Sequence, residues 1–118
     1  MRFSGYFRSS AAYRCRIAFN LKGVAPDFVS IHLRKGEQRT PDFLARNAQG
    51  LVPALETDGH VLTQSLAIIE WLEETTPTPA LLPTDPFDRA HVRALALSIA
   101  CDIHPLQNLR VLRHIKAA

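Results

Sequence analysis

Residues 51–72 read LVPALETDGHVLTQSLAIIEWL, and this stretch decides the fold because a proline, a tight turn and a helix start follow one another closely. Pro53 has no N–H to donate to a neighbouring strand, so the backbone groups of Val52 just before it stay free to bind something else. Asp58-Gly59 is typical of a two-residue type I′ hairpin turn, whose central positions both need positive φ. The stretch therefore predicts a β-hairpin with an unpaired backbone segment at its entry.

A helix is expected directly after this hairpin, beginning at Gln64-Ser65. Ser65 suits the N-cap position, where a side-chain oxygen accepts hydrogen bonds from the first backbone N–H groups. The free amides and the positive end of the helix dipole favour an anion at this place. The hairpin entry and the helix N-terminus are thus expected to form one slot for a peptide-like anion.

The residues before this stretch predict a β-α-β unit. Strands are expected at 2–7 and 28–33, and a helix over roughly 11–22 connects them. Ser9-Ser10 offers an N-cap for this helix, and Gly23 offers a stop. The two strands should be parallel, with a right-handed crossover between them.

A short helix over 41–47, in which Pro41 takes the first helical position, and a hairpin over 54–63 complete the pattern before the helix from Ser65. The order β-α-β-α-β-β-α predicts an α/β fold, a mixed four-stranded sheet with helices packed on it.

The apolar spacing predicts which helix faces are buried. Tyr13, Ile17 and Leu21 share one stripe of the first helix, and Cys15 beside them is expected to be inert packing. On the last helix, four apolar residues are expected to point inward and three glutamates outward: Leu66, Ile68, Ile69 and Leu72, against Glu70, Glu73 and Glu74.

A second structural unit is expected after a proline-rich linker over 77–86. Asp85 and Pro86 form an N-cap and first-turn pair for a helix running to about residue 103. His104-Pro105 interrupts this helix, which resumes over 106–116 with Leu106, Leu109 and Leu112 in register. The domain boundaries predicted in this way are 1–76, 77–86 and 87–118, and the last segment is apolar on more sides than it can bury alone.

Composition and charge exclude several classes of function. The net charge is +3, and the eleven arginines among fourteen basic residues are interspersed with acidic ones, which argues against nucleic-acid binding. No apolar run approaches the ~20 residues of a membrane span, and no basic-then-apolar leader is visible. Cys15 and Cys101 form no C-x-x-C pair and the histidines show no metal-ligand spacing, so we expect no metal, no disulfide framework and a cytoplasmic location.

Taken together, the motifs resemble the zeta class of glutathione transferases, which includes the maleylacetoacetate and maleylpyruvate isomerases. Five segments carry the resemblance in the family's order and spacing: 7–18, 51–55, 64–74, 77–83 and 101–112. The resemblance implies a thioredoxin-like domain that binds glutathione, followed by the start of an all-helical domain.

The resemblance also implies a set of glutathione-binding residues. Val52 beside a cis Pro53 would pair with the cysteinyl backbone, Ser65 with Gln64 would bind the γ-glutamyl carboxylate, and Gln38 falls on a further contact position. Ser9 would stabilise the glutathione thiolate, with Ser10 in support, by the physics that lowers a thiol pKa at a helix N-terminus. The alternative for both serines is a capping role alone.

Further positions matched by the resemblance concern the second substrate. Arg8 would offer a guanidinium to a dicarboxylate at the mouth of the cleft, and Arg110 would do the same from the second unit. His104 and Asn108 match positions that reach glutathione or substrate, although a histidine before a proline also suits a simple helix break. Ala11 departs from the family's usual cysteine or threonine, which leaves fine specificity open.

The leading hypothesis is therefore a glutathione-dependent cis–trans isomerase of maleylacetoacetate or maleylpyruvate in aromatic or tyrosine catabolism, dimeric in its full-length form. The alternatives are a general glutathione transferase and a truncated, non-catalytic glutathione-binding fragment, because family members are roughly twice as long. A dithiol oxidoreductase is disfavoured by the missing C-x-x-C pair.

Overall fold

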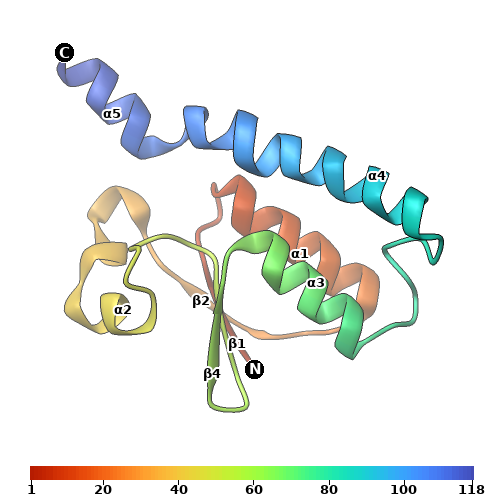
Figure 1. Cartoon of the computed structure of the whole chain (residues 1–118). Coiled ribbons are helices and arrows are strands. Elements are labelled where there is room, and N and C mark those ends of the chain that lie inside the picture. Colours follow the sequence, from red (N-terminus) through yellow and green to blue (C-terminus); the bar gives the residue numbers. More distant parts are fainter. The chain divides into compact units, whose positions relative to one another are not determined.

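The computed structural model describes all residues from Met1 to Ala118 and divides into two compact units, Met1–Leu81 and Leu82–Ala118. The first unit holds a sheet with helices, and the second contains helices and no strand (Figure 1). No helix is both long and apolar enough to cross a membrane.

The first unit contains the predicted mixed four-stranded sheet. Its strands are β1 (Arg2–Gly5), β2 (Asp27–Ser30), β3 (Ala54–Thr57) and β4 (His60–Thr63), in the order β2-β1-β3-β4. β1 pairs with β2 in parallel and with β3 antiparallel, and β3 pairs with β4 antiparallel. The parallel pairing predicted for the β-α-β unit and the α/β fold class are both confirmed.

Two strands are shorter than predicted, because the chain must turn early to start the next element. β1 ends at Gly5, and Ser9 N–H donates to the Tyr6 carbonyl at 2.9 Å in a turn that leaves Phe7 64% exposed. Phe7 therefore lies outside β1, although the sequence predicted a strand over 2–7. Likewise Leu33 begins a 3-10 turn (Leu33–Lys35) in place of continuing β2.

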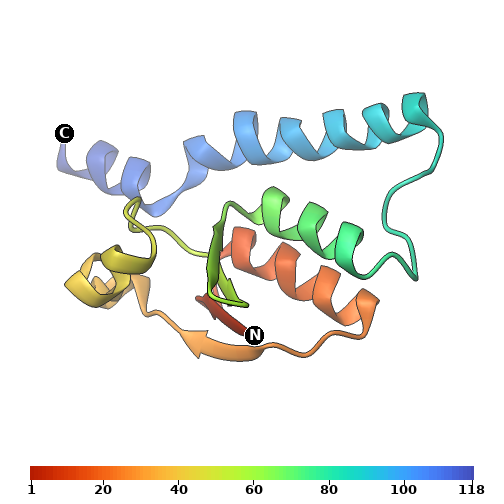
Figure 2. The same cartoon turned by 60° about the horizontal axis from the view of Figure 1, so that its bottom comes forward.

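Helix α1 (Ser10–Lys22) is capped as predicted, by Ser9 at its start and by Gly23 with φ of 69° at its end. Its buried face, however, is not the expected stripe, because Tyr13, Ile17 and Leu21 are all exposed. The residues that face the core are mostly small: Ala12, Cys15, Ala18 and Phe19. α1 packs against helix α3 (Ser65–Thr75) as well as on the sheet, and small side chains allow that close approach (Figures 1 and 2).

The core lies between the sheet and these two helices. Phe3 of β1 meets Phe19 of α1 edge to face, with ring centroids 5.2 Å apart, and Leu55 of β3 is fully buried beside them. Ile68 and Leu72 of α3 are buried in the same cluster, as their spacing predicted.

The hairpin and α3 confirm one local prediction and correct two others. Asp58 and Gly59 have φ of 49° and 77°, the signs that a type I′ turn needs. Gln64 is the N-cap of α3, and Ser65 is its first helical residue, so the expectation of a Ser65 cap is wrong by one position. Glu73 was expected on the polar face but is 7% exposed, because it pairs with Lys22 of α1 inside the unit.

The segment between β2 and β3 folds into 3-10 turns and a short helix. A second 3-10 turn covers Glu37–Arg39, and α2 (Pro41–Arg46) begins with proline as predicted, capped by Thr40. The proline-rich segment is hydrogen-bonded to α3 at Leu81, whose N–H donates to both carboxylate oxygens of Glu73 at 3.0 and 3.1 Å.

The second unit begins with α4 (Pro86–Leu97), whose N-cap Asp85 accepts from the N–H groups of Phe87 and Asp88 as expected. The α-helix ends earlier than predicted, since a π-helical turn covers Ser98–Ile103 and a 3-10 turn covers His104–Gln107. α5 (Leu109–Ala117) follows, so Leu106 lies ahead of that helix and not in register on it.

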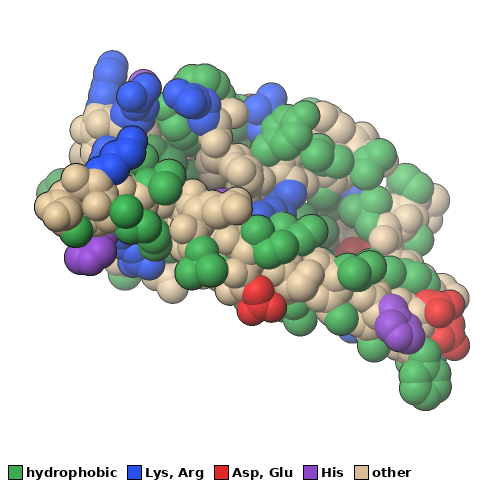
Figure 3. Space-filling model, turned by 90° about the horizontal axis from the view of Figure 1, so that it is seen from above, with side chains coloured by type: hydrophobic (Ala, Val, Ile, Leu, Met, Phe, Trp, Pro, Cys, Tyr) green, Lys and Arg blue, Asp and Glu red, His purple; other side chains and the backbone are tan.

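Large apolar side chains remain exposed in the second unit, among them Phe87 at 80% and Leu95 at 70%. Figure 3 shows hydrophobic side chains at the surface along these helices. This exposure agrees with the prediction that the segment cannot bury its own apolar surface.

Candidate functional site

The strand register brings four predicted site segments to the same edge of the sheet. Ser4 of β1 pairs with Ala54 of β3, and Ala54 pairs in turn with Thr63 of β4. The end of β1, the start of β3 and the end of β4 therefore lie side by side. The chain leaves β1 toward Ser9, enters β3 from Pro53, and leaves β4 toward Gln64 and Ser65. The end of β2 lies at this edge too, since Ser30 pairs with Gly5, and it leads toward Gln38.

The entry to β3 has the free backbone predicted from the sequence. The Val52-Pro53 peptide bond is cis, and neither the N–H nor the carbonyl of Val52 makes a hydrogen bond. The preceding carbonyl, that of Leu51, is held by the side-chain amide of Asn47 at 2.8 Å. The backbone N–H and carbonyl of one residue, Val52, are thus left unpaired next to a carbonyl that is held in place, and an added extended peptide could pair with both groups.

Ser9 lies at the N-terminus of α1, where its hydroxyl oxygen accepts from the Ala12 N–H at 3.2 Å. This bond uses an oxygen lone pair, so the hydroxyl proton stays available for donation to a ligand. Ser10 is the first helical residue and is exposed. The structure therefore gives Ser9 the capping role and leaves its second capacity, as a donor, unused.

The electrostatics of the site favour an anion. Neither α1 nor α3 carries an acidic side chain in its first turn, whereas α2 and α4 carry Asp42 and Asp88 there. The partial positive charge at the two helix N-termini is therefore not neutralised by the chain itself. The two helices are joined near this end by the Cys15 thiol, which donates to the Ser65 carbonyl at 3.5 Å.

Gln64 adopts a backbone conformation that side chains rarely take, with φ of 69°. Such strain is commonly stored at functional sites. Its side-chain Nε2 donates to Oε1 of Gln49 at 3.0 Å. Gln49 is not among the site residues predicted from the sequence, and the only local signal for it is the Asn-Ala-Gln-Gly turn over 47–50 that holds it.

Gln38 is 7% exposed, and its Oε1 has no hydrogen-bond partner. A buried polar atom without a partner is costly, and it is explained most simply by a ligand or water that completes the bond. This unsatisfied acceptor fits the predicted contact position of Gln38.

Cys15 is not a candidate for reactive chemistry. Burial raises the pKa of its thiol to about 12, although the positive charge of Arg14 opposes this shift. The thiol stays neutral and inert near neutral pH, as predicted from its place in mid-helix.

The remaining predicted residues lie in two different places. Arg8 is exposed in the turn just before Ser9. In the second unit, His104 starts the 3-10 turn, and Arg110 is exposed in the first turn of α5. The Asn108 side chain is occupied within its own unit, since it accepts from Val111 N–H at 3.0 Å and donates to the Pro105 carbonyl at 2.7 Å.

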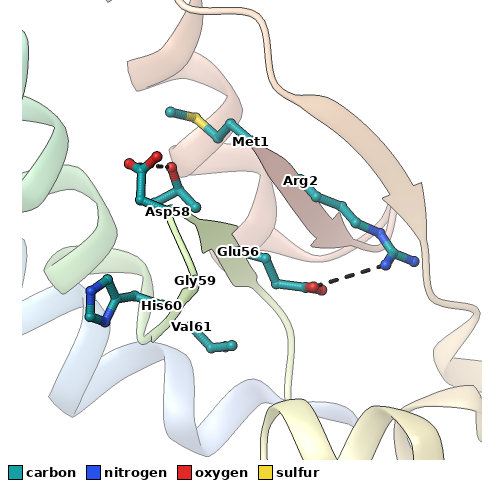
Figure 4. Close-up of a pocket in the computed structure, with 8 residues that line it drawn as sticks. Met1, Arg2, Glu56, Asp58, Gly59, His60 and Val61 are labelled. Carbon is teal, nitrogen blue, oxygen red and sulfur yellow. Dashed lines mark hydrogen bonds and ion pairs between the residues drawn. The ribbon is translucent and has the colours of Figure 1, made fainter.

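A hollow of about 310 Å³ lies at the opposite end of β3 and β4, and Figure 4 shows the residues around it. Arg2 and Glu56 form an ion pair there at 3.9 Å, and His60 points away from that pair. None of the predicted site residues lines this hollow. The structure also contains no group of three or more His, Cys, Asp or Glu side chains that could hold a metal ion.

A comparison with known families agrees with this geometry. A family model described as glutathione S-transferase, N-terminal domain, matches residues 8–75, more than half of the chain. The chain belongs to the glutathione S-transferase family. All of the predicted site residues in the first unit fall within the matched range.

Individual relatives are similar over nearly the whole chain. A maleylpyruvate isomerase from Ralstonia sp. is 52% identical over 116 residues, which are 98% of this chain and 55% of the relative. The holo structure of a maleylpyruvate isomerase, a bacterial zeta-class glutathione S-transferase, superposes with a TM-score of 0.95 at 52% identity, over 98% of this chain and 55% of that one.

A maleylacetoacetate isomerase from Methylobacterium extorquens AM1, crystallised with malonate and glutathione, superposes with a TM-score of 0.91 at 54% identity. The match covers 94% of this chain and 52% of that one. The chain therefore spans about half the length of the relatives it matches.

Proposed function

We propose that this chain provides the glutathione-binding part of a glutathione-dependent cis–trans isomerase that acts on maleylacetoacetate or maleylpyruvate. The observation that carries the proposal is the unpaired backbone N–H and carbonyl of Val52 beside cis Pro53, at the same sheet edge as the N-terminus of α3. Relatives at 52–54% identity that are named as these isomerases support the same reading.

In this proposal glutathione lies along the sheet edge as an added extended segment. Its cysteinyl backbone pairs with the N–H and carbonyl of Val52. Its γ-glutamyl carboxylate accepts from the amide and hydroxyl of Ser65 at the N-terminus of α3, with Gln64 alongside. The unsatisfied Oε1 of Gln38 accepts a donor from the ligand.

The chain's contribution to the reaction is proposed to be thiolate stabilisation and positioning. Bound glutathione supplies a thiolate that adds reversibly to the cis double bond, so that rotation and elimination give the trans alkene. Ser9 donates its hydroxyl proton to the sulfur, while the N-terminus of α1 adds its positive potential and Ser10 supports it. Holding both reactants in place lowers the barrier further.

The second substrate is proposed to be a small dicarboxylate. Arg8, and Arg110 from the second unit, would bind its carboxylates through their guanidinium forks, and His104 and Asn108 would complete the glutathione contacts. The relative crystallised with malonate and glutathione supports a dicarboxylate. We further propose a homodimer, a cytoplasmic location and a place in aromatic or tyrosine catabolism.

The domain assignment is proposed as a glutathione-binding domain over 1–76, a linker over 77–86 and the beginning of a helical domain over 87–118. A calorimetric titration of the purified chain with glutathione tests the binding part of this proposal. Conversion of the cis substrate in the presence of glutathione, followed by absorbance, tests the isomerase part. Binding without turnover would favour the non-catalytic fragment, and absence of binding would overturn the glutathione site itself.

A further inference from the structure

We infer that Gln49 is a positioning residue for the γ-glutamyl end of glutathione, which it orients by holding the side-chain amide of Gln64. This inference rests on the proposed glutathione site and adds a residue to it. The direct observation is the 3.0 Å hydrogen bond from Gln64 Nε2 to Gln49 Oε1, which joins two side chains fifteen residues apart in sequence.

The backbone of Gln64 explains why its side chain needs a partner. Its positive φ fixes the direction in which the side chain leaves the chain, yet the side chain itself is exposed and makes no capping bond to α3. A free glutamine has several rotamers, whose loss on binding weakens affinity. The bond to Gln49 selects one orientation before the ligand arrives.

The loop that presents Gln49 is held on both sides. The buried side chain of Asn47 accepts from the Gln49 N–H at 3.1 Å and donates to the Leu51 carbonyl at 2.8 Å. Gly50 follows with φ of 61°, and a Cβ on it would come within 3.1 Å of the Gln38 carbonyl. The loop is therefore packed against the Gln38 turn and ends at Val52, so it links three of the proposed contact segments.

The hydrogen-bonding capacity that remains suits an amino-acid group. With one Nε2 hydrogen given to Gln49, Gln64 keeps one N–H donor and its carbonyl acceptor, and these match the carboxylate and ammonium of a γ-glutamyl group. Gln49 thus acts through Gln64 and does not need to touch the ligand.

A double-mutant cycle on glutathione affinity tests this inference. Gln49→Ala should raise the Kd by about two- to tenfold, the range of one exposed hydrogen bond. Gln49→Glu keeps an acceptor for the Gln64 N–H, so in the free chain it should disturb the side-chain amide of Gln64 less than Gln49→Ala does. In a Gln64→Ala background, Gln49→Ala should add no further loss. Asn20→Ala, an exposed amide at the other end of α1, serves as the control and should leave the Kd unchanged.

A measurement without ligand separates this inference from the proposed function. In the ¹⁵N NMR spectrum of the free chain, Gln49→Ala should shift the side-chain amide resonances of Gln64. An unchanged Gln64 amide, an unchanged Kd, or a loss that persists in the Gln64→Ala background would each overturn the role of Gln49. If the unsubstituted chain binds no glutathione, the proposed function fails and this inference fails with it.

Discussion

Lys22 Nζ lies 2.5 Å from Glu73 Oε2, and this ion pair joins the last turn of α1 to the second half of α3. Both side chains are almost fully buried, at 0% and 8% exposure. The same carboxylate also accepts from the Leu81 N–H, so one buried charge holds two helices and the end of the first unit. A charge buried in this way is stable only while its partner is present.

Lys22→Met should therefore lower the free energy of unfolding by about 3 kcal/mol, because it leaves the Glu73 carboxylate buried without its counter-charge. Urea unfolding followed by circular dichroism measures the change. Lys35→Met, which removes an exposed lysine, is the matched control and should change stability by less than about 0.5 kcal/mol. Equal effects of the two substitutions would contradict the structural role of the pair.

Ser9→Ala should separate binding from activation. The substitution removes the hydroxyl that is proposed to donate to the sulfur, so the pKa of bound glutathione should rise while its Kd changes by less than about threefold. Ultraviolet absorbance of the thiolate, followed against pH, measures that pKa. Loss of the N-cap should also lower stability by about 1 kcal/mol.

Turnover by the Ser9→Ala protein should fall by about 100-fold or more, as when one donor to a developing charge is removed. Ser9→Thr keeps both the cap and the hydroxyl and should retain activity. Turnover of the alanine variant equal to that of the unsubstituted protein would exclude Ser9 as the activating residue.

Gly50→Ala should destabilise the folded chain by more than the positive φ of Gly50 alone would cause. Both Gly50 and Gly36 have positive φ, but only at Gly50 would a Cβ meet neighbouring atoms, at 3.1 Å from the Gln38 carbonyl. Gly36→Ala should cost about 1 kcal/mol through backbone strain, and Gly50→Ala should cost about 1 kcal/mol more. Thermal unfolding measures both, and identical losses would show that the loop tolerates the added methyl group.

Thiol chemistry should distinguish the two cysteines. Cys101 is exposed and Cys15 is buried with a pKa of about 12, so an aromatic disulfide reagent at about pH 8 should modify Cys101 alone in the folded chain. Both thiols should react once denaturant unfolds it. Reaction of Cys15 at the rate of Cys101 would contradict its burial.

The raised pKa of Cys15 also predicts a pH dependence of stability. In the unfolded chain this thiol ionises near its model value of 9.0, whereas in the folded chain it stays protonated up to about 12. Its contribution to stability is therefore complete below pH 9 and is lost as the pH rises toward 12. In a Cys101→Ser background, the decline between these pH values should be smaller for Cys15→Ala than for the chain that keeps Cys15.

Local signals predicted most of the fold. Asp58-Gly59 requires positive φ, Pro86 and Asp85 start a helix, and Gly23 ends one, and each of these residues acts on backbone within a few positions of itself. The predictions that failed depended on packing between elements. Tyr13 was expected inside, yet α1 meets α3 through small residues, and Glu73 was expected outside, yet it pairs with Lys22.

The residues of the candidate site also fall into two groups, those that local sequence signals predicted and those whose contacts depend on tertiary packing. The sequence identified Val52, Pro53 and Ser65 because a proline and a helix start leave specific backbone groups unpaired. It gave no reason to connect Gln49 with Gln64, since their bond depends on a loop that Asn47 and Gly50 hold in place.

By itself the sequence determined the order of strands and helices, the hairpin turn, most of the helix caps and the free backbone groups of Val52 before Pro53. Only the tertiary structure decided that the end of β1, the start of β3 and the end of β4 share one edge of the sheet, and that the two helices which follow β1 and β4 begin there without an acidic side chain in the first turn. The physical reason is that caps and turns satisfy hydrogen bonds within a few residues, whereas strand register and burial are fixed by contacts between residues far apart in the chain.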